Sequence, residues 1–115
     1  MPNRPAIETA IEPSTCVEAE PFALQVTDDS MEPEFARGCI VVIDPTGLVE
    51  DGAYVIAERT DGLVFRRLRL EGQRVWLDAL NGNYPSEEIE SGIAAIKGVV
   101  VQRAGKRRAY HKRYD

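Results

Sequence analysis

Histidine, cysteine and long apolar runs are all scarce in this 115-residue sequence, and each scarcity bears on what the protein can be. The single histidine, His111, leaves a zinc cluster and a serine–histidine–aspartate triad without their usual parts. The two cysteines, Cys16 and Cys39, suggest neither a disulfide framework nor a metal site. We therefore expect no metal and no cofactor.

No apolar run approaches the roughly 18 to 20 residues that cross a bilayer. The N-terminal region also lacks the basic and then apolar segments of a secretory signal. The sequence therefore predicts a cytoplasmic protein with no membrane partner. Its length fits one domain with a single modest core, and its 43% apolar and 29% charged residues are ordinary for a globular protein.

The net charge of −5 is unevenly distributed. Six of the 14 basic residues lie among the last 13 positions, which hold one acid, so the rest of the chain is strongly acidic. An acidic body argues against a broad DNA-binding face. Residues 104–115 are interpreted as a basic tail that stays solvated, folds back on the acidic body or contacts nucleic acid.

The pattern of short strands and turns predicts an all-β fold, either a barrel or a sandwich-like domain. Residues 1–20, with scattered prolines and acids, predict an extended or flexible arm before a domain over 21–103. Short helices are expected only near 31–36 and 86–91, and the apolar run 39–43 suggests a strand buried on both sides. Strands are predicted over 22–26, 39–43, 54–58, 63–70, 74–80 and 93–102.

A polar turn, Asp28-Asp29-Ser30-Met31-Glu32-Pro33, separates the first two predicted strands. A hydroxyl at the point where a strand breaks into a turn is expected to be accessible, with backbone N–H groups free to bind an oxyanion. Ser30 is thus a candidate nucleophile. The alternative is structural, because a serine in such a turn is more often a helix cap.

Five blocks in order resemble the LexA-like self-cleaving serine peptidases. They are Asp29–Pro33, Gly38 with Val41–Pro45, Asp51-Gly52, Arg67-Leu68, and Asn83–Pro85 with Ile96–Val100. That group includes LexA-type and phage repressor C-terminal domains, UmuD-like proteins and, more distantly, signal peptidases. The resemblance covers about residues 20–102. It implies twisted antiparallel sheets or a partly open barrel, with a shallow substrate cleft past Ser30 in which Met31 and Asp29 take part.

The resemblance also implies a serine–lysine dyad, in which a buried neutral lysine removes the proton of the serine. The lysine position is occupied here by Arg66. A guanidinium stays protonated at any relevant pH, so Arg66 cannot act as the general base. We expect Arg66 to pair with an acid such as Asp29, or to bind a peptide carboxylate or lock the cleft. Lys97 is the first candidate for a substitute base.

Two further departures from the family concern the cleavage site and the second strand. Self-cleaving members carry a small-residue–glycine bond upstream of the serine, but residues 1–29 contain no glycine. The glycine–aspartate pair usual before the second strand is Gly38-Cys39 here, a change expected to affect packing. Trp76 is interpreted as a core or dimer-face aromatic.

These observations favour a regulatory and dimerisation module of the LexA and phage-repressor type that is catalytically impaired. The resemblance implies a homodimer formed through the exposed strand around 99–101. These 115 residues contain no helix-turn-helix, so either a DNA-binding domain is missing from them or the protein acts alone, as UmuD-like proteins do. The alternative is an active serine peptidase with Ser30 as nucleophile, cutting itself or another chain. A third hypothesis is a β domain that holds a peptide segment in the cleft without cutting it.

Overall fold

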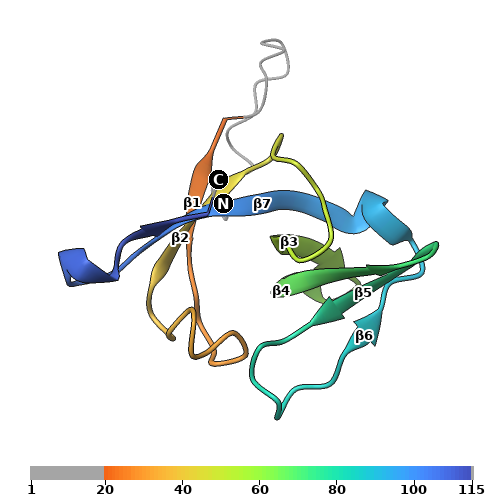
Figure 1. Cartoon of the computed structure of the whole chain (residues 1–115), viewed down its shortest axis with the longest axis horizontal. Helices are drawn as coiled ribbons and strands as arrows, with labels where there is room; N and C mark the ends of the chain where they lie inside the picture. The colour runs from red at the N-terminus through yellow and green to blue at the C-terminus, as the bar shows by residue number, and fades with distance from the viewer. Residues whose placement is uncertain (1–19, 115) are drawn as a thin grey trace.

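Figure 1 shows the protein as a computed structural model, which describes residues 20–114. These residues form one antiparallel sheet with the strand order β1-β2-β7-β3-β4-β5-β6, and β8 pairs with β7 beside that path. The strands are β1 (Phe22–Gln25), β2 (Ile40–Asp44), β3 (Tyr54–Arg59), β4 (Gly62–Glu71), β5 (Arg74–Asp78), β6 (Glu87–Glu88), β7 (Ile96–Ala104) and β8 (Lys112–Arg113). Two short 3-10 helices, η2 (Gly92–Ala95) and η3 (Arg108–Tyr110), flank β7. The all-β prediction is confirmed.

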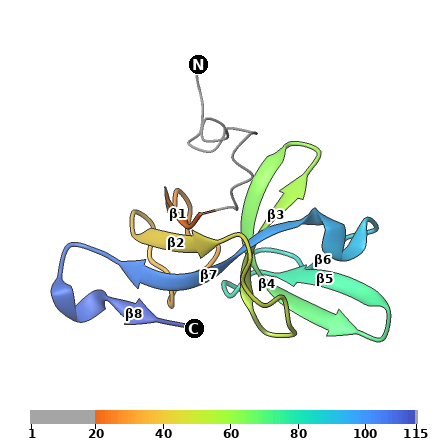
Figure 2. The ribbon, with the colours of Figure 1, turned by 90° about the horizontal axis from the view of Figure 1, so that it is seen from above.

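The long strand β7 joins the two halves of the sheet, and Figure 2 shows it running through the length of the molecule. It pairs with β2 on one side and with β3 on the other. Because side chains alternate along a strand, its neighbouring valines serve different cores. Val100 belongs to one apolar cluster and Val99 to the other.

The two clusters divide the core according to which half of the sheet they fill. The first gathers around the fully buried Met31 and Phe35, which follow Ser30 in the chain. The second contains Leu68 of β4 and Leu77 of β5, also fully buried. The Ser30 turn is therefore anchored directly by the first cluster.

Local expectations were wrong in three places. Residues 31–36 form turns instead of a helix, and the segment 86–91 contains the two-residue strand β6, which pairs with Trp76 and Leu77. The strand expected to be buried on both sides alternates instead, with Val41 and Ile43 buried and its other residues partly exposed. The strand β6 and the exposure pattern of β2 depend on distant pairing partners, which local sequence patterns do not contain.

The dimerisation strand proposed from the sequence is not an exposed edge. Val99 pairs with Val55 of β3 and with Asp44 of β2, and Val99 and Val100 are buried. A strand with both edges paired cannot add a strand from a second copy. Any isologous pairing would have to use another part of the surface.

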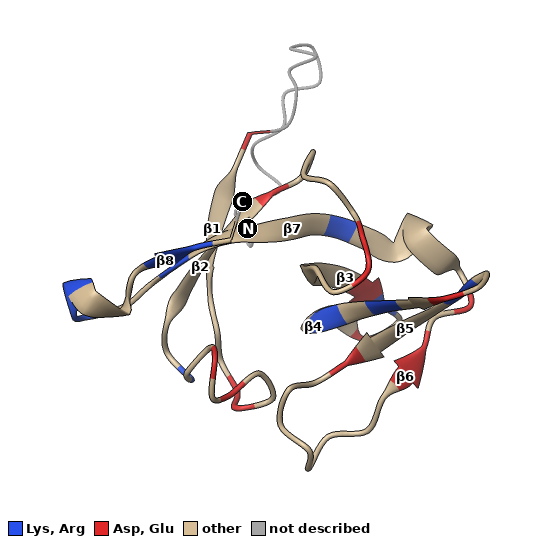
Figure 3. Ribbon diagram, viewed as in Figure 1, with Lys and Arg blue, Asp and Glu red and all other residues tan. Residues whose placement is uncertain are grey.

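The basic C-terminal segment folds back on the sheet, one of the alternatives left open by its composition. In Figure 3 the ribbon is blue, for Lys and Arg, on β8 and at the turn before it. Lys112 and Tyr114 each form a short contact with the carboxylate of Glu34, at 2.9 and 2.6 Å. The described fold thus continues past residue 103 to Tyr114, whereas the proposed arm over 1–20 lies almost wholly outside the described residues. Within residues 20–114, no helix has the length and apolar character needed to span a membrane.

Candidate functional site

Backbone contacts hold the Ser30 turn between two distant loops. Just before it, the N–H of Val26 donates to Cys39 and its carbonyl accepts from Gly38. On the other side, the N–H of Asn81 donates to the carbonyl of Ser30 at 3.0 Å, and its side-chain amide donates to that of Asp29 at 3.1 Å. Both flanks are therefore fixed by segments far away in the sequence.

The hydroxyl of Ser30 is hydrogen-bonded on both sides. It donates to Asp28 Oδ1 at 2.7 Å and accepts from Arg66 Nη1 at 2.9 Å. The Ser30 backbone N–H donates to the same Asp28 oxygen at 3.0 Å. Ser30 is only 1% exposed, so the expectation of an accessible hydroxyl was wrong. Met31 behind it has no exposed surface and packs into the first cluster.

Arg66 reaches Ser30 from the buried face of β4, where it lies between Val64 and Leu68. It is 8% exposed, and its Nη1 also donates to the carbonyl of Phe65 at 2.8 Å. The guanidinium carbon lies 5.5 Å from the ring centroid of Tyr84. Burial lowers the pKa of Arg66, although the nearby Asp28 carboxylate acts in the opposite direction. A guanidinium nevertheless keeps its proton.

Asp28 is the site residue that the sequence analysis missed. Burial raises the pKa of its carboxyl, but the two hydrogen bonds from Ser30 and the charge of Arg66 outweigh this, and the net pKa lies below its ordinary value. A carboxylate with a lowered pKa is a weak base. The available signal was its position two residues before Ser30, the spacing of an aspartate that accepts from the backbone in a turn.

Asp29 has a different partner from the one expected. Its Oδ1 accepts a 2.7 Å hydrogen bond from the hydroxyl of Tyr84, which extends the contact between the turn and the loop after β5. The acids that act on Arg66 are Asp28 and, with a smaller effect, Glu87 instead. Lys97, the candidate substitute base, lies on β7 and forms an exposed ion pair with Glu58 at 3.3 Å. Neither Asp29 nor Lys97 contacts the Ser30 hydroxyl.

A cavity of about 190 Å³ adjoins the Ser30–Arg66 contact, between β1 and β4. Its polar lining includes Asp28, Arg59 and Arg66. Its apolar walls come from β1, β2, β3 and β4, and include Leu24, Val41, Ile56, Leu63 and Phe65. The cavity therefore combines an apolar chamber with charged groups at the serine.

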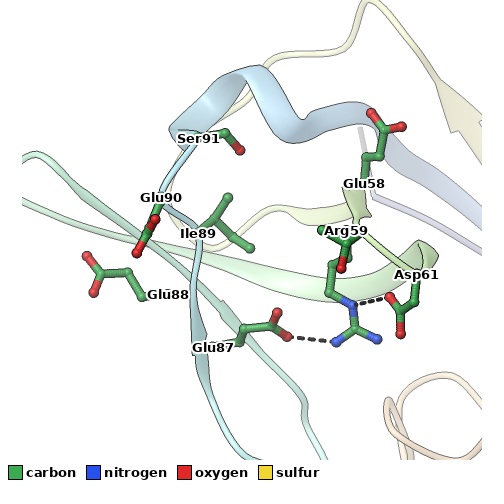
Figure 4. Close-up of a pocket in the computed structure, with 9 residues that line it drawn as sticks. Glu58, Arg59, Asp61, Glu87, Glu88, Ile89, Glu90 and Ser91 are labelled. Carbon is green, nitrogen blue, oxygen red and sulfur yellow. Dashed lines mark hydrogen bonds and ion pairs between the residues drawn. The ribbon is translucent and has the colours of Figure 1, made fainter.

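A larger hollow of about 750 Å³ lies between the β3–β4 turn and β6, and Figure 4 shows its lining. Arg59 forms ion pairs there with Glu87 at 2.7 Å and Asp61 at 3.3 Å. Further acids of this hollow are Glu58, Glu88 and Glu90. Arg59 also lines the smaller cavity, but its charge is already balanced by Glu87 and Asp61. In the part of the chain that the structure describes, no three side chains of the metal-binding kind come together.

The Ser30 hydroxyl thus donates to a carboxylate of lowered pKa and accepts from a permanently charged guanidinium. Trp76 lies elsewhere, partly buried on β5, with the guanidinium carbons of Arg69 and Arg74 at 4.9 and 5.2 Å from its ring centroid.

Comparison with known proteins gives a consistent family match. A family profile described as Peptidase S24-like matches residues 4–101, in agreement with the resemblance found in the sequence. The chain is 35% identical over 88 residues to the HTH-type transcriptional regulator for conjugative element R391 of Providencia rettgeri, covering 70% of this chain and 40% of that protein. It is 36% identical over 92 residues to the prophage repressor CohE of Escherichia coli, covering 77% of this chain and 41% of that protein. The chain thus spans about 40% of the length of these relatives.

Proposed function

We propose a regulatory function without proteolysis for this chain, which belongs to the Peptidase S24-like family. In this proposal it is the peptidase-fold regulatory module of a repressor of the phage and LexA type. The two relatives described above are named as a transcriptional regulator and a prophage repressor, which supports this class of function.

The absence of proteolysis rests on one contact, the 2.9 Å hydrogen bond from Arg66 Nη1 to Ser30 Oγ. In the family mechanism a neutral lysine at this position takes the serine proton. A guanidinium cannot do so, and a general base contributes a factor of about 10² to 10⁴ in rate. The burial of Ser30 adds a second obstacle, because a substrate carbonyl must reach the oxygen that attacks it.

Two partners belong to the proposal. The first is a helix-turn-helix DNA-binding domain joined to this module in the full-length protein, as the name of the first relative suggests for its class. The second is another copy of the module, in a homodimer formed by a surface other than the paired edges of β7. Sedimentation analysis over a range of concentrations tests the second, and a monomer at every concentration would contradict it.

Covalent labelling of Ser30 tests the loss of catalysis. The wild-type chain and the variants Ser30→Ala and Arg66→Lys are treated with a fluorophosphonate probe. Covalent adducts are then detected by measuring the intact mass. We expect the wild type to stay unmodified and Arg66→Lys to gain one adduct, which disappears in the double variant with Ser30→Ala. Arg67→Lys is the matched control, because it makes the same exchange one position along on the exposed face of β4.

An adduct on the wild type that Ser30→Ala removes would contradict the proposal and support the active peptidase. Incubation with an unstructured protein substrate gives an independent readout by mass spectrometry. We expect no new fragments from the wild type. Fragments that depend on Ser30 would likewise assign peptidase activity to this chain.

A further inference from the structure

We propose that the cavity between β1 and β4 binds the C-terminal carboxylate of a peptide, with Arg66 as the group that holds it. This inference rests on the proposed loss of proteolysis and adds the ligand class of the retained site. It concerns a peptide end, the product of an earlier cleavage or the natural terminus of a chain, rather than an intact peptide bond awaiting attack.

Arg66 is a buried cation on which the carboxylate of Asp28 acts only through space. It is more than nine-tenths buried, and within residues 20–114 it forms no ion pair; its hydrogen-bond acceptors are the neutral oxygens of Ser30 and Phe65. A buried charge is stabilised most by a counter-charge in direct contact with it. Arg66 has no such contact among the described residues, and an anionic ligand would supply it.

The donors needed for such a ligand are available. Both hydrogen bonds of the guanidinium use Nη1, so Nε and Nη2 have no acceptor among the described residues. Neither Nε nor Nη2 of Arg66 belongs to the fully buried polar atoms that lack a hydrogen-bond partner. Arg66 also lines the cavity. An Nε–Nη2 pair presents the planar fork that binds both oxygens of a carboxylate.

The other charged residues of the cavity, Arg59 and Asp28, do not supply a direct ion-pair partner for Arg66. Arg59 is balanced by Glu87 and Asp61 from the neighbouring hollow. Asp28 accepts hydrogen bonds from the backbone and hydroxyl of Ser30, and it acts on Arg66 through its charge without a hydrogen bond. Asp28 opposes a second carboxylate through space, but an incoming carboxylate gains two direct hydrogen bonds to Arg66 that Asp28 does not make.

The size and walls of the cavity favour a chain end. Its volume of about 190 Å³ is below the roughly 300 to 1,000 Å³ of typical small-molecule pockets, and suits a single terminal residue. Leu24, Val41 and Leu63 among the walls suit an apolar side chain on that residue. Among the described residues β1 pairs only with β2, so its outer edge is free to hydrogen-bond the preceding peptide backbone.

Matched peptides test the inference. Fluorescein-labelled Gly-Ala-Val-Leu is prepared with a free C-terminal carboxylate and as the C-terminal amide, and binding to the 115-residue chain is followed by fluorescence anisotropy. We expect the acid to bind at least about tenfold more tightly than the amide. Arg66→Gln should abolish this difference, and Arg67→Gln, with the same change of charge on the exposed face, should preserve it.

Equal binding of acid and amide, including no binding of either up to millimolar peptide, would overturn the inference without any variant. A third peptide, Gly-Ala-Val-Glu amide, carries its carboxylate on a side chain, and binding equal to that of the acid would overturn the assignment to a chain end. If Arg66→Gln does not fold, the Nε–H resonance of Arg66 in the wild type replaces it, and should shift with the acid alone. Mass analysis of the same samples separates the two proposals. Peptide cleavage by the wild type would contradict the loss of proteolysis, whereas the ratio of acid to amide binding tests the carboxylate site alone.

Discussion

Arg66 and Ser30 are joined by a hydrogen bond of 2.9 Å that links β4 to the turn after β1 across 36 residues. The contact joins a permanently charged donor to the oxygen that our proposal places at the nucleophile position of the family. The serine then has a structural task, because it satisfies one donor of a buried guanidinium and at the same time donates to Asp28. These two hydrogen bonds give a physical reason for a serine at this position that is independent of catalysis.

Removing the hydroxyl of Ser30 is expected to destabilise the fold. Ser30→Ala leaves Arg66 Nη1 without one acceptor and Asp28 without one donor in a buried setting, which costs about 1 to 3 kcal/mol. Urea denaturation of the variant and the wild type measures the change. The control is Ser86→Ala, whose hydroxyl donates to Asp78 in an exposed position and whose loss should stay within about 0.5 kcal/mol. An unchanged midpoint for Ser30→Ala would show that the serine is not needed structurally.

Acid is expected to loosen the attachment of the C-terminal segment through Glu34. The hydrogen bond from the Tyr114 hydroxyl lowers the pKa of Glu34; burial opposes this, and Lys112 and Arg103 lower it further. Because the folded pKa lies below the unfolded value of 4.5, the stabilisation is complete above that pH and is lost as the pH falls through the folded pKa.

The unfolding free energy measured from pH 6 down to pH 3 therefore tests this contribution. Glu34→Gln should have a shallower decline than the wild type, since it has no proton to gain. Tyr114→Phe retains the carboxylate but lacks the donor with the largest effect on it, so its decline should be intermediate. Parallel curves for all three proteins would contradict the assignment.

Gly98 of β7 is expected to tolerate no side chain. A Cβ at this position would meet the Cγ2 methyl of Ile43 well inside van der Waals contact, and Ile43 is fully buried in the first core cluster. We expect Gly98→Ala to destabilise the protein by about 1 to 3 kcal/mol through overpacking. Gly82→Ala serves as the control, because no atom lies within 4 Å of the position that its Cβ would take, and its thermal midpoint should stay near that of the wild type. Similar midpoints for the two variants would argue against the close approach of β2 and β7.

Residue types and their local order were enough to predict the class of fold and the chemical obstacle at the site. Alternating β-branched residues between turn signals are local features, and they indicated the positions of the main strands. The arginine at position 66 is likewise a matter of residue type, because a guanidinium holds its proton in any fold. The family relationship followed from blocks in a fixed order, and the family match confirmed it.

The surroundings of these residues, in contrast, depend on contacts between distant segments. Asp28, instead of the expected Asp29, acts on Arg66 because of the path of one turn. The burial of the Ser30 hydroxyl depends on β4 and on the loop of Asn81. The pairing of both edges of β7 and the docking of Tyr114 on Glu34 join segments far apart in the chain. Strand periodicity says which face of a strand is apolar, but the neighbour at each edge is set by long-range packing. For that reason the sequence indicated an apolar strand near residue 99 and an arginine at position 66, and the fold showed that both edges of β7 are paired and that Arg66 donates to Ser30.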